Sequence, residues 1–241
     1  MTQKSKLLHK NRVVFDNFQH LFPDFKQKEP GIYVYQSEGF MNLFLHILQR
    51  DSKKILFDLS HYSPNINQTI FVSDPHMEFK FDLKNKLIVP LAYRDAFAQQ
   101  RVEQNGIMDA ETHLNLLDVI LQWFQNLLYQ GYKEIPHFFK WERLPEEVVN
   151  QDYFFSGLMY VTQGVQDLLS EEEMLLVTME LQGFIRMQNG VDYLQMYQHS
   201  ETNEKIYCID QLSKSMIESG TYSAEEIKKY NHFTLLLPSE Y

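Results

Sequence analysis

Five segments between residues 39 and 132 decide the fold, and they read GFMNLFLHIL (39–48), ILFDLSHYSPN (55–65), DPHMEFKFD (74–82), PLAYRDAF (90–97) and LDVILQWFQNLLYQGY (117–132). In the first segment Leu43, Leu45 and Ile47 occupy alternate positions, which is the period of a strand with one buried face. The runs 54–60 and 76–81 repeat this alternation, and short turn-forming gaps separate the runs. We therefore expect an antiparallel sheet with one covered face.

The cover of this sheet is expected to be the segment 109–130. Its leucines and aromatic residues recur three and four positions apart and polar residues occupy the other side, so the segment predicts a long amphipathic helix. Gly131 stands where a left-handed helix cap is favoured. With a further helix expected over 8–22, residues 1–135 are predicted to form an α+β domain.

A second, small α+β domain is expected over residues 153–241. Ser170 and Glu173 have the spacing of a capping box and predict a helix through about residue 188. The run LMYVTQGVQ (158–166) is strand-like because it is rich in β-branched and aromatic residues. Later strands are expected over 192–199, 205–210 and 233–237. Residues 136–152 contain two prolines and are predicted to connect the two domains.

Two stretches of the chain resemble known families. The block 39–132 resembles an uncharacterised domain family carried by phages and conjugative elements of Gram-positive bacteria, and this resemblance extends over residues 10–132. Residues 154–241 are similar to another small uncharacterised family from the same bacteria and their phages. The residues that carry this second resemblance are Thr162, Gly164, Val165, Asp192, Tyr193, Leu194, Gln195, Glu240 and Tyr241. Neither family brings a known active site, so the resemblances imply an accessory gene of a mobile element in which two modules are fused.

The net charge of −10 lies entirely in the second part of the chain. Residues 1–142 hold 16 basic and 16 acidic residues, whereas residues 143–241 hold 6 basic and 16 acidic residues. An acidic domain repels the phosphates of nucleic acid and attracts a basic surface. A protein partner is therefore expected and direct nucleic-acid binding is not, although solubility alone accounts for such a charge equally well.

The expected binding residues are carboxylates and tyrosines of the second half. Tyrosine is favoured at protein interfaces, but the positions of these side chains inside or outside the fold cannot be assigned from the pattern. Acidic residues in a first helical turn also have a purely structural role, because they meet the positive end of the helix dipole. The candidates are Glu146, Glu147, Asp152, Glu171, Glu172, Glu173, Tyr193 and Tyr197.

A candidate metal site lies in the first half and consists of His61, Asp74, His76 and Glu78. Histidine and carboxylate groups together bind Zn²⁺, Mn²⁺ or Fe²⁺. His76 and Glu78 are two positions apart on an expected strand and so share a face. The spacing matches no established metal motif, and a solvated strand face with a turn-forming Asp-Pro explains the same residues.

Other signatures are missing from the sequence. It contains no phosphate-binding glycine loop and no G-x-S-x-G motif, and Cys208, its single cysteine, is expected to be a buried thiol. It has no signal peptide and no apolar run of the ~20 residues that a membrane span needs, so a cytoplasmic protein without a cofactor is expected.

The leading functional hypothesis is a non-enzymatic accessory protein of a mobile element. It would bind a host factor, such as a basic nucleic-acid-binding effector, through the acidic surface and act as an anti-defence inhibitor of the anti-CRISPR or anti-restriction kind. The alternatives are a metal-dependent enzyme centred on His61, Asp74, His76 and Glu78, and a homo-oligomeric scaffold in maintenance of the element.

Overall fold

The computed structural model describes residues 3–64, 71–95, 98–104, 107–136, 139–145 and 151–241. The chain divides into two compact units. The first unit comprises Met1–Ser63 and Val72–His137, and the second comprises Phe138–Tyr241 together with Pro64–Phe71. Each unit has a separate hydrophobic core.

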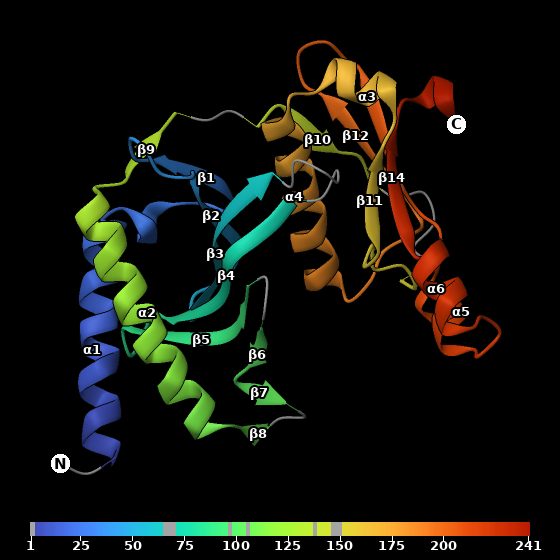
Figure 1. Ribbon diagram of the computed structural model, residues 1–241. Helices are drawn as coiled ribbons and strands as arrows, with labels where there is room; N and C mark the ends of the chain where they lie inside the picture. The colour runs from blue at the N-terminus through green and yellow to red at the C-terminus, as the bar shows by residue number, and fades with distance from the viewer. Residues whose placement is uncertain (1–2, 65–70, 96–97, 105–106, 137–138, 146–150) are drawn as a thin grey trace. The chain divides into compact units, whose positions relative to one another are not determined.

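The first unit is built on a seven-stranded sheet with the order β6-β5-β4-β3-β2-β1-β9 (Figure 1). The registers of β1 with β2 and β9, of β2 with β3, and of β5 with β4 and β6 are all antiparallel, as expected. A separate two-stranded sheet joins β7 (Glu103–Gln104) and β8 (Ile107–Met108). The seven strands are β1 (Gly31–Gln36), β2 (Leu43–Arg50), β3 (Lys54–Pro64), β4 (Phe71–Asp82), β5 (Leu87–Arg94), β6 (Gln99–Arg101) and β9 (Lys133–Ile135).

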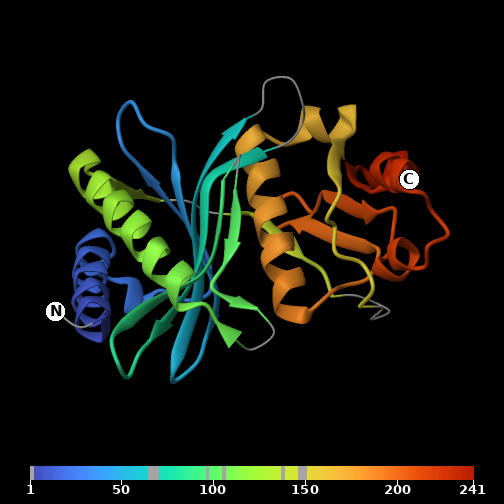
Figure 2. The same ribbon diagram turned by 60° about the horizontal axis from the view of Figure 1, so that its bottom comes forward.

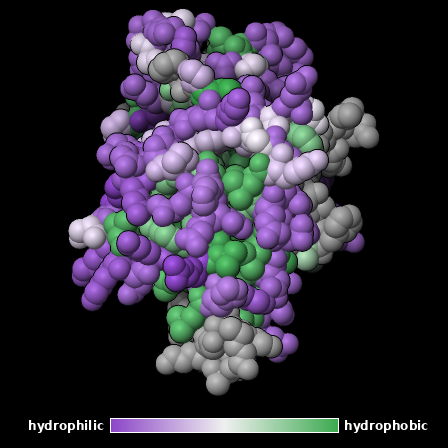
Figure 3. All heavy atoms as spheres, turned by 90° about the vertical axis from the view of Figure 1, so that its left-hand side faces the viewer, coloured by the Kyte–Doolittle hydropathy of each residue, from purple (hydrophilic) through white to green (hydrophobic). Residues whose placement is uncertain are grey.

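Two long helices, α1 (Gln3–Leu21) and α2 (Ala110–Gln130), lie on the same side of this sheet (Figures 1 and 2). Their apolar faces pack with the short helix η1 (Phe25–Gln27) on the strand residues that point toward them. Asp109 caps the start of α2, and Gly131 ends it in the left-handed conformation with φ of 72°. The amphipathic helix and its cap are therefore confirmed. The outward side of the helices is mostly hydrophilic, although Leu8 and Val119 are exposed (Figure 3).

The second unit is built on a five-stranded sheet with the order β10-β12-β13-β14-β11. The strands are β10 (Trp141–Arg143), β11 (Leu158–Val161), β12 (Leu194–His199), β13 (Lys205–Asp210) and β14 (His232–Leu236). Only the pair β11 and β14 is parallel among the registered pairs of this sheet. The helices of the unit are α3 (Gln163–Leu168), α4 (Glu171–Gln188), α5 (Lys214–Glu218), α6 (Ala224–Tyr230) and η2 (Pro238–Glu240).

Helix α4 supplies one side of the second core, which contains Val177, Leu181 and Ile185 and the sheet residues Tyr197 and Cys208. The capping box at its start is present, and Asn189 ends it in the left-handed conformation. Both units thus combine an antiparallel or mixed sheet with packing helices, which confirms the α+β class.

Two boundaries differ from the sequence-based expectation. Only the first half of the run 158–166 is a strand, because Thr162 becomes the N-cap residue of α3 and the backbone turns into that helix. Trp141–Arg143, inside the range 136–152 that was expected to be a connection, forms strand β10 and pairs with β12. The reason is the burial of Trp141, which is 3% exposed and belongs to the second core.

Candidate functional site

The structure separates the proposed metal ligands of the first unit. His61 pairs across the sheet with Leu43, which belongs to the core face, and its ring lies 5.8 Å from that of Trp123 on α2. His76 precedes the core residue Met77 on β4, so its side chain points to the opposite face. Because one histidine faces the helices and the other faces away from them, the structure does not bring His61 and His76 into one site.

A carboxylate that was not among the candidates lies close to His76. His76 Nε2 lies 3.9 Å from Asp58 Oδ2 on the neighbouring strand β3, and both side chains are buried. Asp74 lies on β4, but its side chain is outside the part of the chain that can be described. Among the described residues, no group of three or more His, Cys, Asp or Glu side chains is arranged to hold a metal ion.

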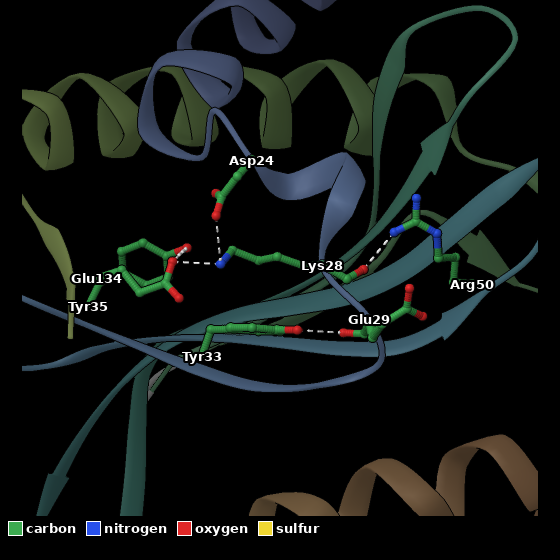
Figure 4. Close-up of polar contacts among 7 residues, drawn as sticks. All are labelled: Asp24, Lys28, Glu29, Tyr33, Tyr35, Arg50 and Glu134. Atoms are coloured by element: carbon green, nitrogen blue, oxygen red, sulfur yellow. Dashed lines mark hydrogen bonds and ion pairs between the residues drawn. The ribbon is translucent and has the colours of Figure 1, made fainter. Parts of the chain in front are cut away.

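A polar cluster around Lys28 joins β1 to β9 in the first unit (Figure 4). Lys28 Nζ lies 2.6 Å from Glu134 and 3.0 Å from Asp24, and Tyr35 also donates a hydrogen bond to Glu134. Burial acts to lower the pKa of Lys28, but the bonds with Glu134 and Asp24 outweigh it and raise this pKa. The cluster fixes the edge strand β9. Lys28 and Glu134 are 106 residues apart, so no local pattern in the sequence indicates it.

The carboxylates proposed for binding have different environments. Glu171 and Glu172 are exposed in the first turn of α4, whereas Glu173 accepts a hydrogen bond from the amide of Ser170. Asp152 accepts hydrogen bonds from the amide and the hydroxyl of Ser215, which lower the pKa of this carboxyl. The remaining two candidates, Glu146 and Glu147, lie outside the described residues.

The two candidate tyrosines also differ. Tyr197 is fully buried in the second core, where its hydroxyl donates to Glu180, so its proposed role at a surface is wrong. The position on β12 explains this, because Tyr197 pairs with Ile206 and faces α4 together with it. Tyr193 precedes the strand and is 38% exposed.

Tyr193 is part of a cluster of four tyrosines, which we call the tyrosine patch. The side chain of Tyr241 lies near that of Tyr193, and its interaction with the Tyr193 hydroxyl raises the pKa of Tyr193. Tyr153 lies 6.0 Å from Tyr193 between ring centroids, and Tyr207 lies 6.1 Å from Tyr241. Tyr241 is 70% exposed and the other three are at least partly accessible. The patch therefore collects residues from four separate segments of the chain.

Carboxylates adjoin the tyrosine patch. Burial raises the pKa of Tyr153, and the negative charges of Asp152 and Asp192 raise it further. Asp192 acts on Tyr193 in the same direction. Of the predicted binding residues, Asp152 and Tyr193 thus lie in one neighbourhood, which sequence reasoning did not bring together.

The C-terminal segment is held beside α3. Glu240 accepts hydrogen bonds from the hydroxyl of Thr162 at 2.6 Å and from the amide of Gly164 at 3.2 Å. A Cβ atom at Gly164 would lie 2.6 Å from Leu237 Cδ1 and 2.9 Å from Glu240 Oε1, so the close approach requires glycine unless those side chains shift. This contact fixes the segment that places Tyr241 in the tyrosine patch.

None of the helices in the described residues combines the length and the apolar character that crossing a bilayer requires. Comparison with curated proteins found no match, and comparison with solved structures found none either. Residues 16–133, which make up most of the first unit, match the family model of a domain of unknown function (DUF6908).

Proposed function

We propose that the chain is a non-enzymatic binding protein whose second unit docks on a basic surface of a protein partner. The observation that carries this proposal is the tyrosine patch, in which Tyr153, Tyr193, Tyr207 and Tyr241 meet beside Asp152 and Asp192. The patch belongs to the half of the chain in which residues 143–241 carry all of the net charge of −10.

The chemistry of the patch suits lysine and arginine side chains. Tyrosine rings give a large contact area at a small cost in conformational entropy, and their faces attract cations. The adjacent carboxylates complement positive charge and speed the encounter with a basic surface. Negatively charged partners are disfavoured, because the acidic unit repels phosphate groups.

The class of partner follows from the resemblance of both parts of the chain to families of Gram-positive phages and mobile elements. We propose a host effector with a basic nucleic-acid groove, which the acidic unit would occupy in place of phosphates. The protein would then act as an anti-defence inhibitor of the anti-CRISPR or anti-restriction kind. In this role the tyrosine rings of the patch take the place of stacked bases.

The test is an affinity capture from a Gram-positive host lysate with the tagged full chain, performed at low and high salt. A double variant, Asp192→Asn with Tyr193→Ala, removes one carboxylate and one ring from the patch. The matched control, Glu225→Gln with Tyr230→Ala, removes the same groups from α6, where Tyr230 is 41% exposed. Circular dichroism establishes that all three proteins are folded.

The proposal expects a basic protein that the wild type and the control retain at low salt and the patch variant does not. Retention should disappear at high salt, because screening weakens interactions between exposed charges. Equal capture by the patch variant, capture that survives high salt, or no specific capture would each reject the proposal.

A further inference from the structure

The second unit contains a cavity of ≈ 350 Å³ at the C-terminal end of α4. This volume is within the range of about 300–1,000 Å³ that is typical of sites for small molecules. The residues around it are of mixed chemistry, with one cation, two carboxamides and apolar groups. They include Arg143, Pro145, Gln151, Phe184, Gln188 and Val191.

The walls of the cavity are brought together by a glycine. Gly190 follows the end of α4 with φ of 109°, and a Cβ atom there would lie 2.4 Å from the backbone oxygen of Gln151. The chain on either side of this approach is joined by a bridge between Tyr153 and Val191. The cavity is therefore bounded by backbone that is fixed in place and does not depend on side chains alone.

Arg143 is held in one orientation at this cavity. The centre of its guanidinium lies 3.3 Å from the ring centroid of Phe184, and its Nε lies 3.6 Å from Glu180 Oε1. Its side chain is only 16% exposed. Glu180 is itself fixed by the hydroxyl of Tyr197. Because this guanidinium is already ordered, it loses little further conformational entropy when it binds a planar oxyanion. This small entropic cost favours binding.

Among the described residues, the positive charge of Arg143 is only partly compensated. The ion pair with Glu180 involves Nε, and no described residue accepts a hydrogen bond from the two terminal amino groups of Arg143. Burial raises the pKa of Glu180, against the effects of Tyr197 and Arg143. A mostly buried cation that keeps two pairs of donors is suited to a carboxylate or a phosphate, which accepts such bonds bidentately.

We propose that this cavity binds a small organic anion that carries a carboxylate or a phosphate group. Arg143 pairs with the oxyanion, Gln151 and Gln188 supply amide donors, and Pro145 and Val191 contact the apolar part of the ligand. No residue of the tyrosine patch lines the cavity, and the site has the opposite charge preference. It therefore stands or fails independently of the proposed protein partner.

The test is a titration of the full chain with three probes at constant ionic strength, read by NMR shifts of the Gly190 and Val191 amides. Benzoate and phenyl phosphate carry the two anionic groups, and benzamide is the neutral counterpart of benzoate. Arg143→Gln removes the cation, Arg143→Lys keeps the charge without the planar fork, and Gln188→Leu removes one amide. Lys140→Gln is the matched control, because it removes an exposed cation that pairs with Glu201 in the same unit.

The proposal expects at least one of the two anions to bind the wild type at least about tenfold more tightly than benzamide, and the stronger of the two identifies the acid group. Arg143→Gln should lose this binding, Arg143→Lys and Gln188→Leu should weaken it severalfold, and Lys140→Gln should leave it unchanged. If Arg143→Gln does not fold, Arg143→Lys and Gln188→Leu test the proposal in its place. The proposal is overturned if benzamide binds as tightly as the anions, or if the Arg143 and Gln188 variants bind like the wild type. It is also overturned if Lys140→Gln loses as much affinity as Arg143→Gln, or if neither anion shifts the two amide signals at about 10 mM.

Discussion

At the scale of single residues, Asp210 is a buried carboxylate at the end of a strand. It ends β13, is 3% exposed, and accepts a hydrogen bond of 2.7 Å from the amide of Phe155. Phe155 has φ of 49°, a left-handed conformation that side chains rarely adopt. The carboxylate therefore holds a strained turn in place. Burial raises the pKa of Asp210 to about 6, although hydrogen bonds from backbone amides oppose this.

The raised pKa predicts a pH-dependent stability that Asp210→Asn should lack. The folded pKa of about 6 exceeds the ordinary value of 3.8, so folding favours the protonated form. The contribution of Asp210 to the free energy of unfolding is fully present below pH 3.8 and is lost as the pH rises through about 6. Between pH 4.5 and 7.5 the wild type should lose about 2 kcal/mol of unfolding free energy relative to Asp210→Asn. Urea unfolding of both proteins measures this, and parallel pH profiles would contradict it.

The sequence contains a signal that places His61 and His76 on opposite faces of the sheet. His61 stands two positions after Leu59, so the alternation that placed Leu59 in the core also places His61 on the same face. His76 stands next to Met77, which places it on the other face. Counting positions along the two strands would have separated the proposed metal ligands. For Asp210 there was no such signal, because Phe155 lies 55 residues away.

At the scale of elements, the start of α4 depends on its capping box. The amide of Glu173 donates to Ser170 Oγ at 3.2 Å, and the amide of Ser170 donates to Glu173 at 2.9 Å. Ser170→Ala should lower the unfolding free energy by about 1 kcal/mol and speed hydrogen exchange in the first turn of α4. Ser156→Ala, an exposed serine outside any helix, is the control. An effect no larger than that of the control would show that the cap does not stabilise α4.

The parallel pair of β11 and β14 depends on Gly157. A Cβ atom at this position would lie 1.9 Å from the backbone oxygen of Asn231, just before β14. Backbone cannot move aside as a flexible side chain can, so Gly157→Ala should cost at least about 2 kcal/mol of unfolding free energy. Amide exchange in β11 should rise more than in β12. Exchange that is unchanged in β11 would mean that the pairing tolerates the added methyl group.

At the scale of the whole molecule, the two cores predict separate responses to core mutations. Phe57 is fully buried between the rings of Phe25 and Phe79 in the first unit, and Leu181 is fully buried in the second. Phe57→Ala should cost about 3–5 kcal/mol and Leu181→Ala about 2–5 kcal/mol. Calorimetry should show that each variant lowers the midpoint temperature of a different unfolding transition. If both variants lower one common transition, the units unfold as a single cooperative structure.

Much of the architecture follows from local patterns. The alternation at Leu43 and Leu45, the cap at Gly131 and the capping box at Ser170 each involve residues a few positions apart. Such patterns are local because side chains alternate every two residues along a strand and helix caps join residues three or four positions apart. The α+β class, the antiparallel sheet, its covering helix and the concentration of negative charge in the second part could therefore be predicted from the sequence.

Which of the candidate residues meet depends on how the strands and helices pack together. Tyr197 is buried, whereas Tyr193 joins Tyr153, Tyr207 and Tyr241. The sequence pattern around Tyr193 and Tyr197 does not indicate which of the two is buried. The Lys28 cluster and the cavity beside Arg143 also join segments that are far apart along the chain. The physical reason is that these contacts depend on the pairing of strands and the docking of helices, which the spacing of residues within one element does not encode.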